Sequence, residues 1–359
     1  MDRFAKLLHK CKEEKSRGNA QQLLASIRET GLERHRSLGN NLVSTLAELG
    51  SLHDAQQIFD DLVHRNSRSW NSLISGYVKH GRLKQALALY NTMPKEDSLH
   101  LNVYTFVALI NACAKLKDLE QGLCLHAEVD KFGWINRDLF IGSSLVYMYA
   151  KCGFVSRAQE MFDKLVVQDE VCWNAILAAY AQVGESQNVF QLFNQMLEEC
   201  RKPDLVTFIS VLNACSHAGE VWNGEKHFEA IAREYDLLPV AEHYACMIDL
   251  LGRSGCIEKV IVMLKDIPMQ PNKMVWLTML GACRKWGYVN LGRCAFEHVL
   301  QLDAKDGSAY ICMANIYTEA EMQDEAMRIE TMGVENQASL KSRQHMTNIS
   351  PQCFAFLLE

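Results

Sequence analysis

Apolar residues recur along this chain at the spacing that places them on one face of a helix. Residues 68–90 read "RSWNSLISGYVKHGRLKQALALY", and their first apolar stripe consists of Trp70, Leu73, Ile74, Tyr77 and Val78. These positions follow the i, i+3, i+4, i+7 rule of an amphipathic α-helix. Gly81 interrupts the pattern and a second stripe follows, so the segment is predicted to form two helices joined by a tight turn.

The same plan recurs at a fixed period. The stretch "LGNNLVSTLAELGSLHDAQQIFDDL" (38–62) matches "IGSSLVYMYAKCGFVSRAQEMFDKL" (141–165) at an offset of 103 residues. "TFVALINACAKLKDLEQG" (105–122) matches "TFISVLNACSHAGEVWNG" (207–224) at an offset of 102. One helix pair cannot bury its apolar face alone, so successive pairs are expected to stack. We therefore predict an all-α fold, a right-handed α-solenoid superhelix of helix-turn-helix repeats similar to tetratricopeptide arrays.

The predicted repeats tile almost the whole chain. The array covers residues 1–272 and consists of the units 1–35, 36–66, 67–102, 103–138, 139–169, 170–204, 205–240 and 241–272. Two further helix pairs are expected in 273–332: one unit spans 273–306, and a degraded one begins at 307. Residues 333–359 match no repeat and are expected to form a divergent, disordered tail.

Composition and charge limit the function. Of the 359 residues, 48% are hydrophobic and 22% charged, which is enough for an extended core. The net charge of −6 argues against nucleic-acid binding unless basic residues are placed locally. No apolar stretch reaches the roughly 18 residues of a membrane span. The thirteen cysteines include no CxxC pair, and we expect small buried residues in a reducing compartment.

The amino-terminal segment "MDRFAKLLHKCKEEKSRG" is predicted to form a helix of the first repeat. It has no apolar region typical of a secretory signal, and its acidic residues are unusual in an organelle transit peptide. Two alternatives follow: a cytosolic protein, or a chain whose own amino terminus lies upstream of this sequence.

Several of the repeated segments resemble the motifs of a known family. "SWNSLISGYVKHGRLKQALALYNTM" and "CWNAILAAYAQVG" form one type, "TFVALINACAKLKDLEQG" a second and "LVYMYAKCGFVSRAQEMFDKL" a third. These resemble the P, L and S motifs of plant pentatricopeptide repeat proteins of the P-L-S class. "VWLTMLGACRKWGYVNLGRCAFEHVLQLD" and "AYICMANIYTEA" resemble the E motifs that follow such arrays.

The deaminase (DYW) domain that ends many members of this family has no counterpart here. A zinc deaminase needs H-x-E and P-C-x-x-C, and "HAE" at 126–128 matches the first half by chance. The chain is accordingly expected not to be an enzyme and to need no metal or cofactor.

The resemblance implies modular binding of single-stranded RNA in a mitochondrion or chloroplast, with one base read per repeat. Family members most often select a cytidine for C-to-U editing. For this chain the resemblance implies that a DYW-type deaminase or an editing accessory protein acts in trans on the bound RNA. The chain is expected to be a monomer and not to bind a membrane.

In this family the fifth and the last residue of a repeat select the base. The resemblance assigns the fifth positions of the P and S units to Asn40, Asn71, Ser143 and Asn174, and the last positions to Asn66, Asn102, Asp169 and Asp204. By the family's code these pairs select 5′-C-C-x-G-U, with x opposite unit 103–138. The L units carry Val107 and Ile209 at the fifth position, which cannot hydrogen-bond to a base. The alternative for the asparagines is a cap or a hydrogen bond between repeats.

Two more columns have roles in the family. The residues that would flank the base are Tyr104, Phe140, Val171 and Val206. The residues that would face phosphates are Lys79, Lys115, Lys151, Arg253 and Lys285, at the thirteenth position of their units. The alternative for this basic column is a set of solvated helix ends, where the helix dipole favours cations.

Two other functions remain open. A tetratricopeptide-type scaffold would bind protein and no RNA, although its uniform 34-residue period differs from the 31-residue units here. A truncated, inactive relative would fold but have no target.

Overall fold

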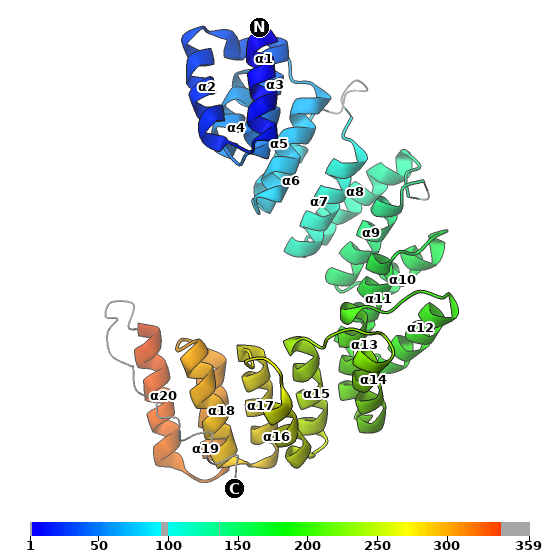
Figure 1. Ribbon diagram of the computed structural model, residues 1–359, viewed down its shortest axis with the longest axis vertical. Coiled ribbons are helices and arrows are strands. Elements are labelled where there is room, and N and C mark those ends of the chain that lie inside the picture. The colour runs from blue at the N-terminus through cyan, green and yellow to red at the C-terminus, as the bar shows by residue number, and fades with distance from the viewer. Residues whose placement is uncertain (1, 95–99, 136, 339–359) are drawn as a thin grey trace. The chain divides into compact units, whose positions relative to one another are not determined.

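The computed structural model describes residues 2–94, 100–135 and 137–338 of the chain. These residues form twenty α-helices, a short 3₁₀ helix and no strand. The chain divides into two compact units, residues 1–179 and 180–359. Within each unit, helices follow one another as a series of hairpins (Figure 1), which confirms the predicted all-α repeat fold.

Each repeat opens with a first helix. The first helices are α1 (Asp2–Glu13), α3 (Arg36–Glu48), α5 (Ser67–Lys79), α7 (Val103–Leu116), α9 (Leu139–Lys151), α11 (Glu170–Val183), α13 (Leu205–Ala218), α15 (Ala241–Arg253), α17 (Lys273–Trp286) and α19 (Gly307–Glu319). From α3 to α19, each begins at the residue that follows the end of a unit in the sequence tiling. The repeat boundaries and the helix starts therefore coincide.

A second helix returns antiparallel to each first helix. The second helices are α2 (Arg17–Glu29), α4 (Leu52–Asp61), α6 (Leu83–Asn91), α8 (Leu119–Lys131), α10 (Val155–Lys164), α12 (Ser186–Glu198), α14 (Val221–Arg233), α16 (Ile257–Asp266), α18 (Val289–Leu302) and α20 (Gln323–Ala338). The 3₁₀ helix η1 (Leu32–Arg34) joins α2 to α3. Because α20 continues past residue 332, the expected tail can begin no earlier than 339, and 339–359 lie outside the described residues.

The first helices pack on one another and form a layer in each unit. In the first unit, contacts run from α1 through α3, α5 and α7 to α9, and in the second from α13 through α15 and α17 to α19. A second helix lies between consecutive first helices: α4 contacts both α3 and α5, and α18 contacts both α17 and α19. Each repeat therefore buries its apolar face against its neighbours, as repeat proteins require.

The aromatic core repeats with the sequence. Trp70 meets Phe59 edge to face with the ring centroids 4.7 Å apart, and Trp173 meets Phe162 in the same way at 4.7 Å. Both tryptophans are almost fully buried. Neither indole Nε1 has a hydrogen-bond partner within the described residues, so these side chains stabilise the repeats by packing alone. The 103-residue offset of the sequence is thus an offset between equivalent core contacts.

The part of the chain that the structure describes has neither a membrane-spanning helix nor a cluster of metal-ligating residues. No helix there combines the length and apolar character needed to cross a membrane. No group of three or more His, Cys, Asp or Glu residues there could hold a metal ion. His126 of the "HAE" triplet places Nδ1 2.6 Å from the Tyr149 hydroxyl, and burial lowers the pKa of this histidine.

None of the described cysteines forms a disulfide. Burial raises the pKa of the most enclosed thiols to about 12; these are Cys113, Cys172, Cys215, Cys246 and Cys283. Because the thiolate is the reactive form, these residues act as small core side chains, as the sequence predicted.

Candidate nucleic-acid interface

The last residue of a repeat caps the first helix of the next repeat. Asn66 Oδ1 accepts a hydrogen bond from the Ser69 N–H at 2.9 Å, and Asn102 Oδ1 accepts from the Thr105 N–H at 2.8 Å. Asparagine is a strong N-cap because its oxygen pairs with an N–H that the helix leaves free. The Nδ2 atoms of Asn66 and Asn102 donate to nothing within the described residues, and Asn102 is exposed.

The two aspartates at last positions cap in the same way. Asp169 Oδ1 accepts from the Cys172 N–H at 2.9 Å, and Asp204 Oδ1 accepts from the Thr207 N–H at 2.8 Å. The last positions therefore share one location and differ in chemistry: asparagine presents an amide that donates, and aspartate presents a carboxylate that accepts.

The fifth residue of the third repeat joins its own helix to the last residues of the same repeat. Asn71 Nδ2 donates to the carbonyl oxygens of Ser67 and His100, the latter at 3.2 Å. Asn71 Oδ1 accepts from the Asn102 N–H at 2.8 Å. Only 9% of Asn71 is exposed. The side chain therefore holds the segment that carries the cap of α7, and its amide keeps one orientation.

Asn40, the fifth residue of the second repeat, makes the equivalent contacts. Its Nδ2 donates to the carbonyl oxygens of Arg36 and His64, and its Oδ1 accepts from the Asn66 N–H at 3.4 Å. Because these partners belong to the same repeat as the asparagine, the side chains form neither the helix cap nor the hydrogen bond between repeats that the sequence left open. Sequence reasoning did not predict this role: Oδ1 accepts from the backbone N–H of the last residue of the same repeat.

The remaining fifth positions differ from this pattern. Ser143 is buried, and its Oγ donates to the Leu139 carbonyl within α9 at 2.7 Å. Asn174 is half-buried. Val107 and Ile209 are also half-buried, with no polar atom in the side chain. The fifth position is thus polar at 40, 71, 143 and 174 and apolar at 107 and 209.

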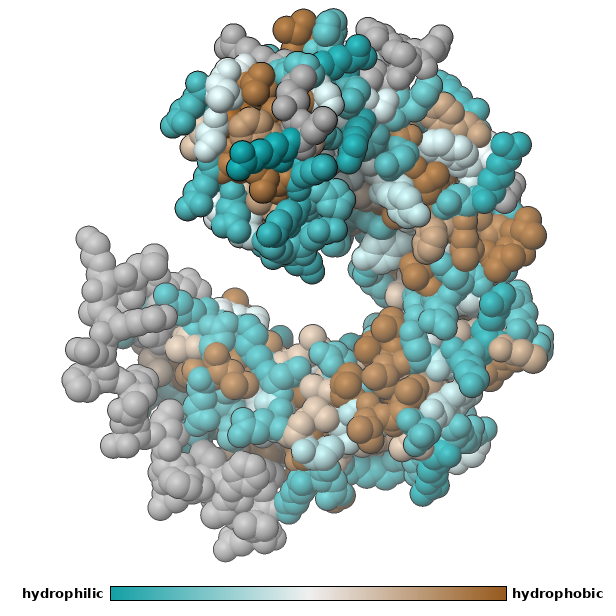
Figure 2. Space-filling model, turned by 45° about the horizontal axis from the view of Figure 1, so that its top comes forward, coloured by the Kyte–Doolittle hydropathy of each residue, from teal (hydrophilic) through white to brown (hydrophobic). Residues whose placement is uncertain are grey.

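The predicted base-flanking residues are exposed. Tyr104 is 77% and Phe140 60% exposed in the first turns of α7 and α9, and Val171 and Val206 are exposed at the matching positions of α11 and α13. Sequence reasoning missed Met274, which is exposed at the second position of α17. Apolar groups lie interspersed among hydrophilic ones on the face displayed in Figure 2. Exposed apolar side chains in a helix's first turn suit contact with the face of an unstacked base.

The basic column lies at the opposite ends of the first helices. Lys79, Lys115 and Lys151 are exposed in the last turns of α5, α7 and α9. Lys151 Nζ lies 5.6 Å from the centre of the Tyr147 ring. The thirteen residues of α5 make it about 20 Å long, and Lys79 and Asn71 lie in opposite halves of this helix.

In the second unit the basic residues have protein partners. Arg253 Nε pairs with Asp249 Oδ2 at 2.8 Å. Lys285 Nζ donates to the Arg253 carbonyl at 2.7 Å and lies 5.3 Å from the centre of the Trp286 ring. A phosphate would have to compete with these contacts.

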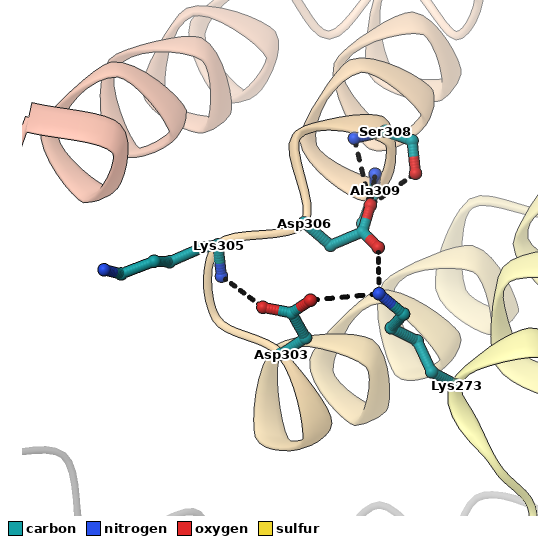
Figure 3. A network of polar contacts seen from close by, with 6 residues as sticks. All are labelled: Lys273, Asp303, Lys305, Asp306, Ser308 and Ala309. Carbon is teal, nitrogen blue, oxygen red and sulfur yellow. Dashed lines mark hydrogen bonds and ion pairs between the residues drawn. The ribbon is translucent and has the colours of Figure 1, made fainter. Parts of the chain in front are cut away.

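A polar network joins both ends of the unit 273–306. Lys273 Nζ lies 2.9 Å from Asp303 Oδ2 and 2.9 Å from Asp306 Oδ2 (Figure 3). Asp306 also caps α19 by accepting from the Ala309 N–H. Hydrogen bonds from Ser308 and from Lys273 lower the pKa of Asp306 to about 2. These contacts join the end of the unit 273–306 to its first residue and to the start of α19.

These features define a class: a helical-hairpin repeat protein with polar, apolar and basic columns along its first helices. Comparison with known families then gives matches to the PPR repeat family over 65–115 and 168–217, and to the PPR repeat over 104–134, 143–169 and 242–269. The chain is a pentatricopeptide repeat protein of the type found in plants.

Curated relatives come from Arabidopsis thaliana. The chloroplastic pentatricopeptide repeat-containing protein CRR2 is 36% identical over 313 residues, which are 87% of this chain and 47% of CRR2. A mitochondrial pentatricopeptide repeat-containing protein is 33% identical over 313 residues, 87% of this chain and 49% of the relative. The chain thus spans about half the length of these relatives.

Among solved structures, pentatricopeptide repeat protein PPR10 in complex with an 18-nt psaJ RNA element resembles this chain with a TM-score of 0.74. The two are 18% identical, and the match covers 89% of this chain and 48% of PPR10. A structure of PPR10 from maize matches with a TM-score of 0.64. At this identity the likeness shows the fold.

Proposed function

We propose that this chain binds single-stranded RNA and reads one base per repeat with the fifth and last residues of its P and S units. The observation that carries the proposal is the hydrogen bond from the Asn102 N–H to Asn71 Oδ1 at 2.8 Å. It places side by side two residues that are 31 positions apart in the sequence and that one base could contact together. The RNA complex of PPR10 supports RNA as the ligand class.

The last position supplies the choice between pyrimidines. The Watson–Crick edge of cytosine has an acceptor at N3, whereas uracil has an N–H donor there. Asn66 and Asn102 offer a donor and fit cytosine; Asp204 offers only acceptors and fits uracil. Asp169 fits guanine because its carboxylate can accept from the N–H donors of that base. Ser143 would lie beside the guanine, which is larger than a pyrimidine. The proposed core is 5′-C-C-x-G-U, where Val107 leaves x unread.

The RNA serves organellar metabolism in this proposal, because curated relatives are named chloroplastic or mitochondrial. We propose that the chain selects a site for C-to-U editing and that a deaminase acts in trans. Exposed flanking side chains such as Tyr104 support the extended RNA that such selection needs.

Crosslinking of the chain in plant cells, followed by sequencing of the bound RNA, tests this function. Enrichment of 5′-C-C-x-G-U near edited cytidines in organellar transcripts is expected. Enrichment of an unrelated motif would contradict the assignment of residues to bases. A partner protein captured equally well after ribonuclease treatment, with no RNA crosslinked, would instead favour the scaffold function.

A further inference from the structure

A polar cavity lies where the turns of the first three repeats meet. Its volume is about 560 Å³, and residues from the start of α2, the α3–α4 turn and the α5–α6 turn line it. It lies at the opposite end of α5 from Asn71, since His80, which follows α5, is part of its wall. Neither the base-reading nor the base-flanking columns include a residue of this cavity.

Cationic and imidazole side chains converge on the cavity from three repeats. Arg17 comes from the first repeat, His53 from the second, and His80 and Arg82 from the third. The only carboxylate in the lining is Asp54. The lining is therefore positive in a chain whose net charge is −6, which favours an anion.

Packing fixes part of this wall. Arg17 Nε donates to Ser51 Oγ at 3.0 Å, and Ser51 is buried. The terminal nitrogens of Arg17 make no hydrogen bond within the described residues, so the far side of its guanidinium is available. A Cβ atom on Gly50, which has a φ of +80°, would lie 2.7 Å from Cε1 of His80, so the glycine allows the imidazole to rest against the turn.

The start of α4 adds backbone donors to these side chains. Ser51 makes no side-chain cap, and the N–H groups of His53 and Asp54 donate to no carbonyl oxygen among the described residues. In the fourth repeat the equivalent helix end is closed, because Asp118 Oδ1 accepts from the Gln121 N–H at 3.2 Å. An oxyanion in the cavity would therefore meet N–H groups as well as guanidinium groups.

We propose that this cavity binds a phosphate group, carried either by RNA or by a free nucleotide. Arginine forks match the oxygens of a phosphate and pair with them through two parallel hydrogen bonds. Lys79 directly precedes His80, so the cavity adjoins the lysine column, and an RNA strand along that column could place a phosphate there. The proposal does not depend on base reading.

The double variant Arg17→Gln/Arg82→Gln tests the cavity. The matched control is Arg28→Gln/Lys84→Gln, which removes one charge from α2, the helix that Arg17 begins, and one from α6, the helix that Arg82 precedes, without touching the lining. We expect inorganic phosphate and AMP to bind the wild type and the control alike, and the cavity variant about tenfold more weakly or not at all. Calorimetry measures the affinities, and melting temperatures check the fold.

The source of the phosphate is tested with one oligonucleotide in 5′-phosphorylated and 5′-hydroxyl forms. If RNA is the source, the cavity variant loses affinity for the oligonucleotide while the control does not. If a free nucleotide is the source, AMP binds without displacing the oligonucleotide, and only AMP binding falls in the variant.

Absence of saturable phosphate or AMP binding, together with unchanged RNA binding by the cavity variant, would overturn the proposal. Arg82→Gln alone keeps the test valid if loss of the Arg17–Ser51 hydrogen bond lowers stability, because Arg82 makes no side-chain hydrogen bond within the described residues. Failure of base reading at Asn71 and Asn102 would leave this result unaffected.

Discussion

At the scale of single residues, the thirteenth-position cations have different surroundings. Lys79 and Lys115 are exposed and form no ion pair within the described residues. Arg253, in contrast, pairs with Asp249, and Lys285 donates to the Arg253 carbonyl. A phosphate can approach the two lysines without breaking a protein contact, so we expect the proposed contact with the RNA backbone to depend more on them than on Arg253 and Lys285.

The double variant Lys79→Gln/Lys115→Gln should weaken RNA binding to a similar extent for every sequence. It should also reduce the slope of log Kd against log salt by roughly 0.7 per lost phosphate contact, because fewer counterions are released. Titrations by fluorescence anisotropy at several KCl concentrations measure both effects. Lys131→Gln/Lys164→Gln, which removes the same charge from second helices, is the control. Equal slopes in both double variants would contradict a phosphate role for the column.

At the scale of the helices, stacking depends on small residues where first helices come close. A Cβ atom on Gly252 in α15 would lie 2.4 Å from the Cβ of Ala282 in α17. Gly281, in the same turn of α17, has no atom within 4 Å of its would-be Cβ. Substitution of Gly252 by alanine therefore tests the packing between the two helices, whereas substitution of Gly281 tests helix propensity alone.

Gly252→Ala is expected to lower the free energy of unfolding by about 1–3 kcal/mol, because the added methyl group forces the two helices apart. Gly281→Ala should raise it by up to about 1 kcal/mol, because alanine favours the helix and meets open space. Urea denaturation followed by circular dichroism measures both. The same sign for the two substitutions would mean that α15 and α17 do not pack as described.

The polar network of Lys273, Asp303 and Asp306 predicts that the stability of the protein depends on pH. The pKa of Asp306 is lowered to about 2, below its ordinary value of about 3.9. Its contribution to stability is therefore complete above about pH 4 and is lost as the pH falls towards 2.

Asp306→Asn keeps a capping oxygen but removes the ion pair with Lys273. The variant should be less stable than the wild type by about 1 kcal/mol at pH 7, allowing for solvent screening, and this difference should shrink at pH 2.5. Urea unfolding of both proteins at the two pH values provides the measurement. A difference that stays constant with pH would place the effect in the cap and not in the charge.

At the scale of the whole molecule, the sequence predicted the repeats well because each unit carries its own signals. The Gly-centred turns and the Trp70 and Trp173 stripes mark helices locally, and the helix starts coincide with the tiling. Contacts between residues far apart in the sequence could not be predicted in this way. The hydrogen bond between Asn71 and the Asn102 backbone joins the two ends of one unit, and the polar cavity combines side chains from three turns, none of which forms a motif alone.

The central claim is that the last residue of each repeat chooses the base, and Asn102→Asp tests it most directly. Aspartate caps α7 as well as asparagine does, and the Asn71 bond uses the backbone N–H, so the melting temperature should not change. The substitution replaces a donor by an acceptor. Competition binding with 5′-C-C-x-G-U and 5′-C-U-x-G-U oligonucleotides should show the preference moving from C to U at the second position, by about tenfold. An unchanged preference for C, or an equal loss of affinity for both oligonucleotides, would contradict the claim.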